Sequence, residues 1–338
     1  MKKSYINHIS YYLPENVITN EELSKEFPDW SVTKIASKIG IDQRHIAASN
    51  EFSSDMGVKA AEALFEEYTN VSKSDIDFLL FCTQSPDYFL PTTACILQDR
   101  LGLSKSTGAL DFNLGCSGFI YGLTLAKGLI ASCAAKNVLL ICAETYSKFI
   151  NKNDKGNRSI FGDAASATLI SDGKNGYGAE ILNFKLGTDG TGAKNLIVKG
   201  GGMRYRNSEA ETFTDSYGNE ATSNDLMMNG PEIFNFTSKN IPGLIMDTIK
   251  ENNLNQDDID SYIFHQANAY MLNHLRKKIK VDKEKFKLKM NFCGNTVSST
   301  IQIVIAELMK DSEIKNDTHV LIAGFGVGYS WGATILKF

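Results

Sequence analysis

The 338-residue chain has little of what several classes of protein require. It contains only six prolines, and 35 lysines and arginines against 39 aspartates and glutamates give a net charge of −4. Because it has no basic field for a phosphate backbone, we expect no nucleic-acid partner. The start, Met1-Lys2-Lys3, continues with polar residues and is not a secretory signal, which favours a cytoplasmic protein.

Long hydrophobic runs and paired cysteines are also missing. The most apolar stretch, residues 118–135, contains Thr124 and Lys127, so we expect a buried helix there and no membrane span. The six cysteines include no CxxC pair and no spacing with histidine that is typical of a metal site. We therefore expect no bound metal, and most of the cysteines should be small core residues.

The chain does contain an internal repeat. "DIDFLLF" at 75–81 recurs 183 residues later as "DIDSYIF" at 258–264. "NVLLICA" at 137–143 recurs 182 residues later as "HVLIAGF" at 319–325, and each copy leads through a Gly-rich turn to another strand-like run. Two landmarks at nearly the same offset indicate an internal duplication.

The alternation of apolar, β-branched runs with helix-like stretches predicts an α/β protein. The duplication divides it into two halves, residues 1–173 with the candidate nucleophile and residues 174–338 with the candidate histidine and asparagine. Residues 186–228, rich in Gly, Asn, Ser and Thr, are expected to be an irregular excursion.

Cys116 stands in "DFNLGCSGF", where a strand-like run meets a helix-like stretch. Gly115, Ser117 and Gly118 leave room for a substrate to approach the thiol. The unpaired amides and the dipole of a helix N-terminus favour a thiolate, so we expect the pKa of Cys116 to lie below its usual value of about 8.5. The pattern predicts a nucleophile.

Two residues of the second half can reach Cys116 if the halves pack about a pseudo-twofold axis. His265 directly follows "DIDSYIF", and Asn295 lies in "GNTVSST" at a position that the repeat relates to Cys116. Such a set supports papain-like hydrolysis, in which histidine is the base for cysteine, or condensation, in which histidine and asparagine hold one thioester oxygen. The duplication favours condensation, because it makes His265 and Asn295 separate donors.

The segments "DFNLGCSGF", "FHQAN", "GNTVSS" and "AGFGVGYSWGATILKF" together resemble the thiolase superfamily, most closely its β-ketoacyl-acyl-carrier-protein synthase III enzymes. The resemblance implies a five-layered α-β-α-β-α fold of two duplicated halves, a homodimer and no tightly bound cofactor. It implies that Cys116 takes an acyl group from acyl-CoA, and that this group condenses decarboxylatively with malonyl-carrier protein. His265 and Asn295 would hold the enolate, and the backbone amides of Cys116 and Val327 would form the oxyanion hole.

The resemblance also assigns substrate contacts, and several of them depart from the family pattern. The acyl pocket would include Phe325 and also Leu90, where phenylalanine is usual. Lysines replace two arginines of the nucleotide site and lose their planar, bidentate geometry, while a tyrosine replaces the carrier-docking arginine. The residues that would contact coenzyme A or the carrier protein are Trp30, Lys38, Lys155 and Tyr270.

Other functions stay open at this point. The altered docking positions favour transfer of the acyl group from Cys116 to an oxygen or nitrogen acceptor, in a secondary or surface-glycan pathway. A non-catalytic partner protein would usually lack the cysteine. The 3-hydroxy-3-methylglutaryl branch would need a glutamate base in the first half, and the sequence does not place Glu144 in the site. The motifs specify neither the acyl-donor length nor the carrier.

Overall fold

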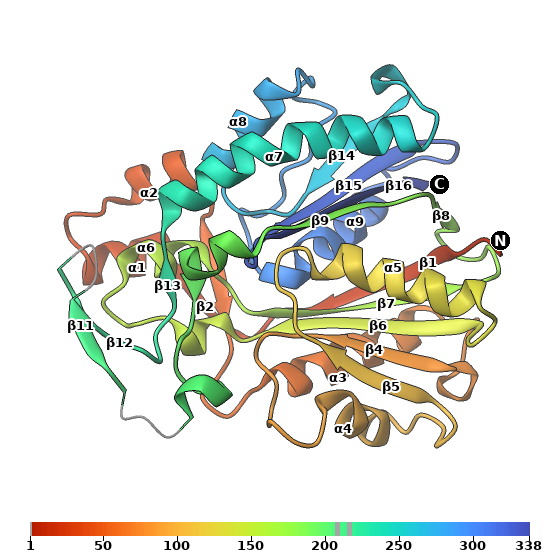
Figure 1. Cartoon of the computed structure of the whole chain (residues 1–338), viewed down its shortest axis with the longest axis horizontal. Coiled ribbons are helices and arrows are strands. Elements are labelled where there is room, and N and C mark those ends of the chain that lie inside the picture. Colours follow the sequence, from red (N-terminus) through yellow and green to blue (C-terminus); the bar gives the residue numbers. More distant parts are fainter. Residues whose placement is uncertain (1, 207–209, 215–217) are drawn as a thin grey trace.

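Strands of both halves form one mixed sheet in the structure, a computed structural model that describes residues 2–206, 210–214 and 218–338 (Figure 1). The helices are α1 Asn20–Glu26, α2 Val32–Ile39, α3 Ser53–Glu67, α4 Thr93–Arg100, α5 Gly118–Ala131, α6 Lys155–Ile160, α7 Gly230–Glu251, α8 Ala269–Lys278 and α9 Thr300–Lys310. The strands are β1 Tyr5–Tyr12, β2 Asn16–Thr19, β3 Gln43–Ile46, β4 Phe78–Cys82, β5 Gly108–Phe112, β6 Asn137–Glu144, β7 Ala164–Ser171, β8 Ala179–Ile181, β9 Lys185–Thr188, β10 Leu196–Ile197, β11 Thr212–Thr214, β12 Glu220–Thr222, β13 Met227–Met228, β14 Ser261–Phe264, β15 His319–Gly326 and β16 Ser330–Lys337.

The order of the strands shows how the two halves are joined. Along the main sheet it is β14-β15-β16-β8-β1-β7-β6-β4-β5, and β9 pairs with β16. The short strand β8 pairs with β1 and with β16, so it links the first-half strands to the second-half strands. Helices α5 and α9 lie between the two sets of strands, α3 and α4 cover the first set, and α7 and α8 cover the second (Figure 1). The predicted five-layered α/β fold is confirmed.

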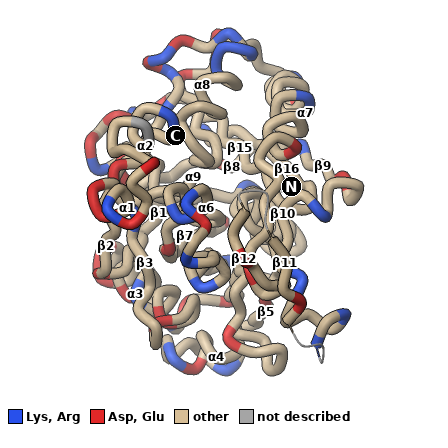
Figure 2. Tube along the Cα trace, turned by 90° about the vertical axis from the view of Figure 1, so that its left-hand side faces the viewer, with Lys and Arg blue, Asp and Glu red and all other residues tan. Residues whose placement is uncertain are grey.

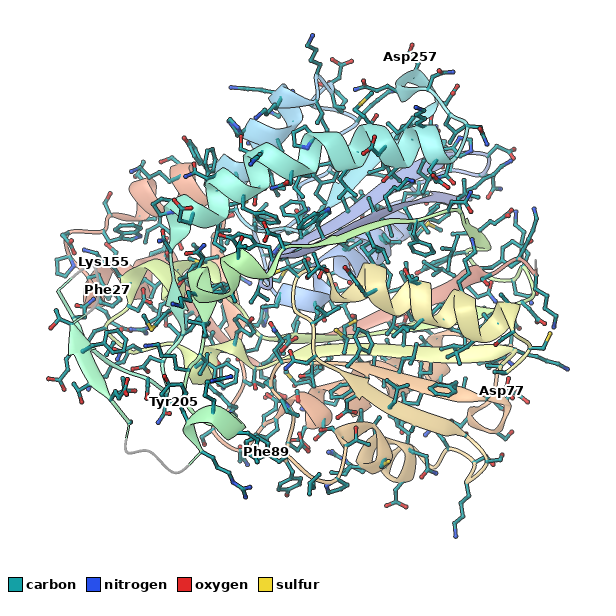
Figure 3. The ribbon with its side chains drawn as sticks, in the orientation of Figure 1. Phe27, Asp77, Phe89, Lys155, Tyr205 and Asp257 are labelled. Atoms are coloured by element: carbon teal, nitrogen blue, oxygen red, sulfur yellow. The ribbon has the colours of Figure 1, made fainter. Side chains whose placement is uncertain are left out.

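The sequence repeat is also a structural repeat. β4 pairs in parallel with β6, and β14 pairs in parallel with β15. In both pairs an aspartate binds the start of the second strand: Asp77 Oδ2 accepts from the amide of Asn137 at 2.9 Å, and Asp260 Oδ2 accepts from the amide of His319 at 2.8 Å. Figure 3 shows Asp77 and the second-half residue Asp257 at the same end of the molecule. The same local contacts therefore align the parallel strands in each half.

The stretch 118–135 contains the buried helix that the sequence predicts, α5. Its residues Phe119, Ile120 and Leu123 are fully buried in a core shared by strands of both halves. Among the described residues, we find no helix with the length and apolar character that crossing a membrane requires. The described residues of the stretch 186–228 form short strands, short 3-10 helices and turns, as expected, but part of this excursion lines the cavity described below; residues 207–209 and 215–217 lie outside the described residues.

Candidate active site

Cys116 lies in the connection between the end of β5 and the start of α5 at Gly118, and only 7% of its surface is exposed. Glycines allow the close packing around it. A Cβ on Gly326 would lie 2.8 Å from the Cys116 sulfur, and one on Gly118 would lie 2.3 Å from the sulfur of Cys82. The small residues of "GCSGF" and "GFGVG" therefore let two loops close on the thiol.

The predicted lowering of the Cys116 pKa is wrong. Burial raises the pKa of this thiol to about 12, and the nearby carboxyl of Glu144 also raises it. The backbone amides of Cys116 and Val327 face the sulfur and act in the opposite direction, but more weakly. Helix α5 begins two residues beyond the cysteine, whereas desolvation acts on the sulfur itself, so desolvation dominates. The free thiol is protonated at neutral pH.

Val327 fits its position in the loop after β15. It is not among the non-glycine residues with a positive φ in the described chain, so its β-branched side chain causes no backbone strain there. Its carbonyl accepts a hydrogen bond from Oγ of Ser330 at 3.2 Å, while its amide faces Cys116. The substitution of a glycine by valine in this loop therefore leaves the amide donor in place.

His265 directly follows β14, and its amide donates to the carbonyl of Ala323 in β15 at 2.8 Å. Nδ1 of its ring lies 2.8 Å from Oγ1 of Thr300, the first residue of α9. Burial lowers the pKa of His265 to about 3, and a hydrogen bond with the backbone of Val297 offsets a smaller part of this effect. The imidazole is therefore neutral at physiological pH and carries a single N–H.

Asn295 lies in the turn before α9, after Gly294, whose φ of +77° favours glycine. The Asn295 amide donates to the carbonyl of Ile160 at 2.9 Å, and its carbonyl accepts from the amide of Gly162 at 3.0 Å. Oδ1 of the side chain accepts from the amide of Val297 at 2.9 Å. This bond orients the side-chain amide, so that Nδ2 is the donor left for a ligand.

Val297 connects the three candidate catalytic residues. Its side chain packs in one apolar cluster with Cys116, its backbone bonds the ring of His265, and its amide binds Asn295. Its φ of +54° is rare for a β-branched residue and is typical of strain held at a functional site. The structure thus brings together residues from three distant segments of the chain.

A cavity of about 350 Å³ lies beside this cluster. Its buried lining residues Tyr146, Leu196 and Leu226 belong to the same apolar cluster as Cys116, so the cavity borders the cluster that contains the thiol. The predicted acyl-pocket residues lie elsewhere: Leu90 is 85% exposed, and Phe325 is buried with its ring centroid 6.1 Å from that of His265. The lining consists of Gln84, Asn113, Tyr146, Phe149, Ala193, Leu196, Ile197, Val198, Leu226, Val327 and Gly328.

The sequence analysis missed most of this lining. The lining residues Ala193, Leu196, Ile197, Val198 and Leu226 belong to the irregular excursion, which has no periodicity to reveal a buried face. Gln84 and Tyr146 could have been found, because each comes two residues after a buried parallel strand, β4 or β6. The carboxyl ends of parallel strands meet at one edge of the sheet, where ligands bind.

Glu144, which the sequence did not place, is the last residue of β6 and is fully buried beside the site. Its carboxyl accepts hydrogen bonds from the amide of Gln84 at 3.0 Å and from the hydroxyls of Ser85 and Ser298, each at 3.2 Å. Burial raises its pKa to about 8, because these bonds compensate only in part for desolvation. Since Ser298 belongs to the second half, this carboxyl links the two halves beneath Cys116.

The predicted nucleotide and carrier contacts lie at the surface. Nζ of Lys155 is 5.6 Å from the ring centroid of Trp30, and it pairs with Asp29. Figure 3 shows Lys155 at one edge of the molecule, and Figure 2 shows acidic and basic residues next to one another around α1 and α6. Lys38 is exposed in the last turn of α2, and Tyr270 is 67% exposed in the first turn of α8. Of the four predicted contact residues, the structure thus pairs Trp30 with Lys155.

Comparisons with known proteins agree with this geometry. Sequence models described as 3-oxoacyl-[acyl-carrier-protein] synthase III and its C-terminal part match residues 110–190 and 249–338. The β-ketoacyl-[acyl-carrier-protein] synthase III of Clostridium perfringens is 36% identical over 100% of both chains. A solved 3-oxoacyl-(acyl-carrier-protein) synthase III has a TM-score of 0.96 at 43% identity, covering 99% of this chain and 100% of that one. The 3-oxoacyl-(acyl-carrier protein) synthase of Burkholderia xenovorans LB400 has a TM-score of 0.90 at 35% identity, with 99% and 93% covered.

Two duplicated halves that meet around a buried thiol, together with solved structures of the same shape, define an acyl-transferring enzyme of the thiolase superfamily. Within that superfamily the chain belongs to the β-ketoacyl-acyl-carrier-protein synthase III family.

Proposed function

We propose that Cys116 takes an acyl group from acyl-CoA and that this group condenses with malonyl-carrier protein, giving 3-oxoacyl-carrier protein, coenzyme A and CO2. The observation that carries the proposal is the pair of backbone amides, of Cys116 and Val327, that face the Cys116 sulfur. The sulfur attacks the thioester carbonyl, and the thiol proton leaves on the sulfur of coenzyme A. The carbonyl oxygen becomes negative between the two amides, each of which contributes about 3 kcal/mol of stabilisation.

His265 and Asn295 serve the second step. Nδ2 of Asn295 and the single N–H of His265 donate to the malonyl thioester oxygen, which becomes the enolate oxygen as CO2 leaves. Oγ1 of Thr300 lies 2.8 Å from Nδ1 of His265 and 3.2 Å from the carbonyl oxygen of Val297, to which its hydroxyl can also donate. When the hydroxyl donates to Nδ1 instead, the ring proton resides on Nε2 and is available for this bond. The carbanion then attacks the acyl thioester, the carbon–sulfur bond to Cys116 breaks, and the product leaves. These steps use no tightly bound cofactor.

The substrate partners would bind at surface residues outside the cavity lining. Trp30 and Lys155 form a cation–π pair that fits the nucleotide of coenzyme A. The last turn of α8 carries Arg276, Lys277 and Lys278, while exposed Tyr270 lies in its first turn. This helix provides a basic surface for an acidic carrier protein, with the tyrosine in place of the usual arginine.

A homodimer would complete the cavity. The consecutive residues Tyr88, Phe89 and Leu90 are 63%, 63% and 85% exposed. Of the two strands that end the main sheet, β5 is closer in sequence to these residues. An exposed apolar loop beside an unpaired strand edge fits a second copy of the chain. In this arrangement the partner's Leu90 would close the open side of the cavity.

Intact-protein mass spectrometry tests the proposal. The enzyme is incubated with acyl-CoAs from acetyl to dodecanoyl and then with malonyl-carrier protein. Wild-type enzyme should gain one acyl adduct and lose it as a 3-oxoacyl-carrier product, whereas Cys116→Ala should gain none. Asn295→Asp keeps the size of the side chain and the acceptor atom but removes the Nδ2 donor, so it should load normally and condense roughly 100-fold more slowly. Condensation at the wild-type rate by Asn295→Asp would show that the assigned chemistry is wrong.

A further inference from the structure

The cavity beside Cys116 has one polar wall. The hydroxyl of Tyr146 donates to Oε1 of Gln84 at 2.5 Å, and Nε2 of Gln84 donates to Oδ1 of Asn113 at 3.2 Å. All three residues line the cavity. Most of the other lining residues are apolar, so the cavity is amphipathic; we call these residues the apolar wall, and they include Phe149, Leu196, Val198 and Leu226.

The polar wall is fixed next to the nucleophile. Gly115 immediately precedes Cys116, and a Cβ there would lie 2.4 Å from Oε1 of Gln84, so the side-chain amide packs directly on this backbone. The main-chain amide of Gln84 donates to buried Glu144 at 3.0 Å, and Tyr146 is itself only 4% exposed. The side-chain amide of Gln84 is therefore held against the residue that immediately precedes Cys116.

The wall presents unused donors, while each of its two side-chain carbonyl oxygens already accepts one hydrogen bond. Tyr146 uses its only O–H on Oε1 of Gln84, which directs Nε2 toward Asn113. Within the described part of the chain, one hydrogen of Gln84 Nε2 and both hydrogens of Asn113 Nδ2 have no acceptor. A plain hydrocarbon chain packed against half-buried Gln84 would displace water from its unused donor without replacing the hydrogen bond, which is unfavourable.

The thioester oxygen does not accept hydrogen bonds from these donors, because in the proposed function it lies between the amides of Cys116 and Val327. A different oxygen, further along the acyl chain, would satisfy them. The apolar wall would at the same time contact the hydrocarbon edge of that chain. The two walls together therefore suit an acyl group that is apolar on one side and oxygenated on the other.

We propose that the acyl group loaded onto Cys116 carries a hydroxyl or keto oxygen on its chain and that Gln84 and Asn113 donate hydrogen bonds to it. This inference rests on the proposed function and specifies its substrate class: an oxygenated acyl thioester rather than a plain fatty acyl thioester. Gln84 and Asn113 are then the specificity-determining residues for the loading step.

A competition experiment tests the inference. Wild-type enzyme is mixed with equal concentrations of butyryl-CoA and one oxygenated four-carbon donor: either enantiomer of 3-hydroxybutyryl-CoA, 4-hydroxybutyryl-CoA or acetoacetyl-CoA. Intact mass distinguishes the adducts, and their initial rates of formation give the ratio of kcat/KM values. At least one oxygenated donor should load tenfold or more faster than butyryl-CoA. Equal or faster loading of butyryl-CoA in every pair overturns the inference and leaves the proposed function standing.

Variants locate the preference. Gln84→Met keeps the length of the side chain without its donors, and Asn113→Leu makes the same change at an exposed position that is safe for folding. Each should reduce the preference, and the two together should bring the ratio close to one. Asn70→Leu makes the same change as Asn113→Leu at an exposed position outside the cavity lining, and it should keep the wild-type ratio. A preference that survives both polar-wall changes contradicts the assignment, and the absence of an adduct from every donor overturns the proposed function itself.

Discussion

The buried carboxyl of Glu144 makes the stability of the protein depend on pH. Its pKa is raised from 4.5 to about 8 in the folded protein. Between these pH values the unfolded chain has released the proton while the folded protein keeps it, so the free energy of unfolding falls as the pH rises. At about 1.36 kcal/mol per pKa unit, the whole difference amounts to about 5 kcal/mol, and it is complete above pH 8.

Glu144→Gln removes this titration. The glutamine Oε1 can still accept from the amide of Gln84 and the hydroxyl of Ser85, which bind the same carboxyl oxygen, and its NH2 group can donate to the hydroxyl of Ser298, so the local structure should persist. The free energy of unfolding of the variant, minus that of the wild type, should therefore increase by about 3 kcal/mol between pH 5 and pH 7.5.

Urea unfolding at several pH values measures this difference. His265, whose pKa is lowered from 6.5 to about 3, makes stability fall as the pH drops below 6.5, but it does so in both proteins and cancels in the subtraction. Glu21→Gln, at an exposed position on α1, serves as the control for loss of a surface carboxyl. A variant-minus-wild-type difference that stays constant across this range would refute the reasoning, because it would mean that Glu144 ionises equally in both states.

Three further predictions concern the chemistry and the assembly. Thr300→Val leaves Nδ1 of His265 with only the backbone of Val297 as a partner, which favours the proton on Nδ1. Malonyl decarboxylation by this variant should slow about 100-fold, while loading of the acyl group stays normal. An unchanged decarboxylation rate would contradict this tautomer argument. Gly326→Ala places a Cβ 2.8 Å from the sulfur of Cys116, so no acyl adduct should form. The melting temperature of this variant should fall by several degrees, consistent with overpacking of about 1–3 kcal/mol. A normal adduct would show that the loop moves aside. Leu90→Asp should convert the proposed homodimer to a monomer in sedimentation experiments at micromolar concentration, and a stable dimer would show that the apolar loop is not the interface.

The fold was predictable because its signals are local and repeated. The "DID" copies mark corresponding parallel strands, and the aspartates within them bind the neighbouring strands in the same way. The positions of Cys116, His265 and Asn295 were accessible for a related reason, since each lies just after a strand or in a glycine turn.

What the sequence could not give depends on burial and on packing between distant segments. Helix capping lowers the pKa of a cysteine, and only the folded protein shows that desolvation outweighs it at Cys116. The carboxyl of Glu144 accepts a hydrogen bond from Ser298 in the other half. No periodic pattern in the sequence predicts a contact between residues so far apart. Leu90 carries an apolar side chain on an exposed loop, so its predicted place in a pocket depends on a second chain.

The two loops around the thiol are made at different times during synthesis. Val327 follows Cys116 by 211 residues, so at about 5–20 residues per second the ribosome makes the cysteine tens of seconds before the amide that faces it. During that interval the sulfur lacks its burial, and its pKa is that of an ordinary thiol, about 8.5. A stalled chain that ends after β7 should therefore react with alkylating agents at neutral pH, whereas the finished enzyme resists them. Folding of the second half would thus shield the proposed nucleophile before a substrate can bind.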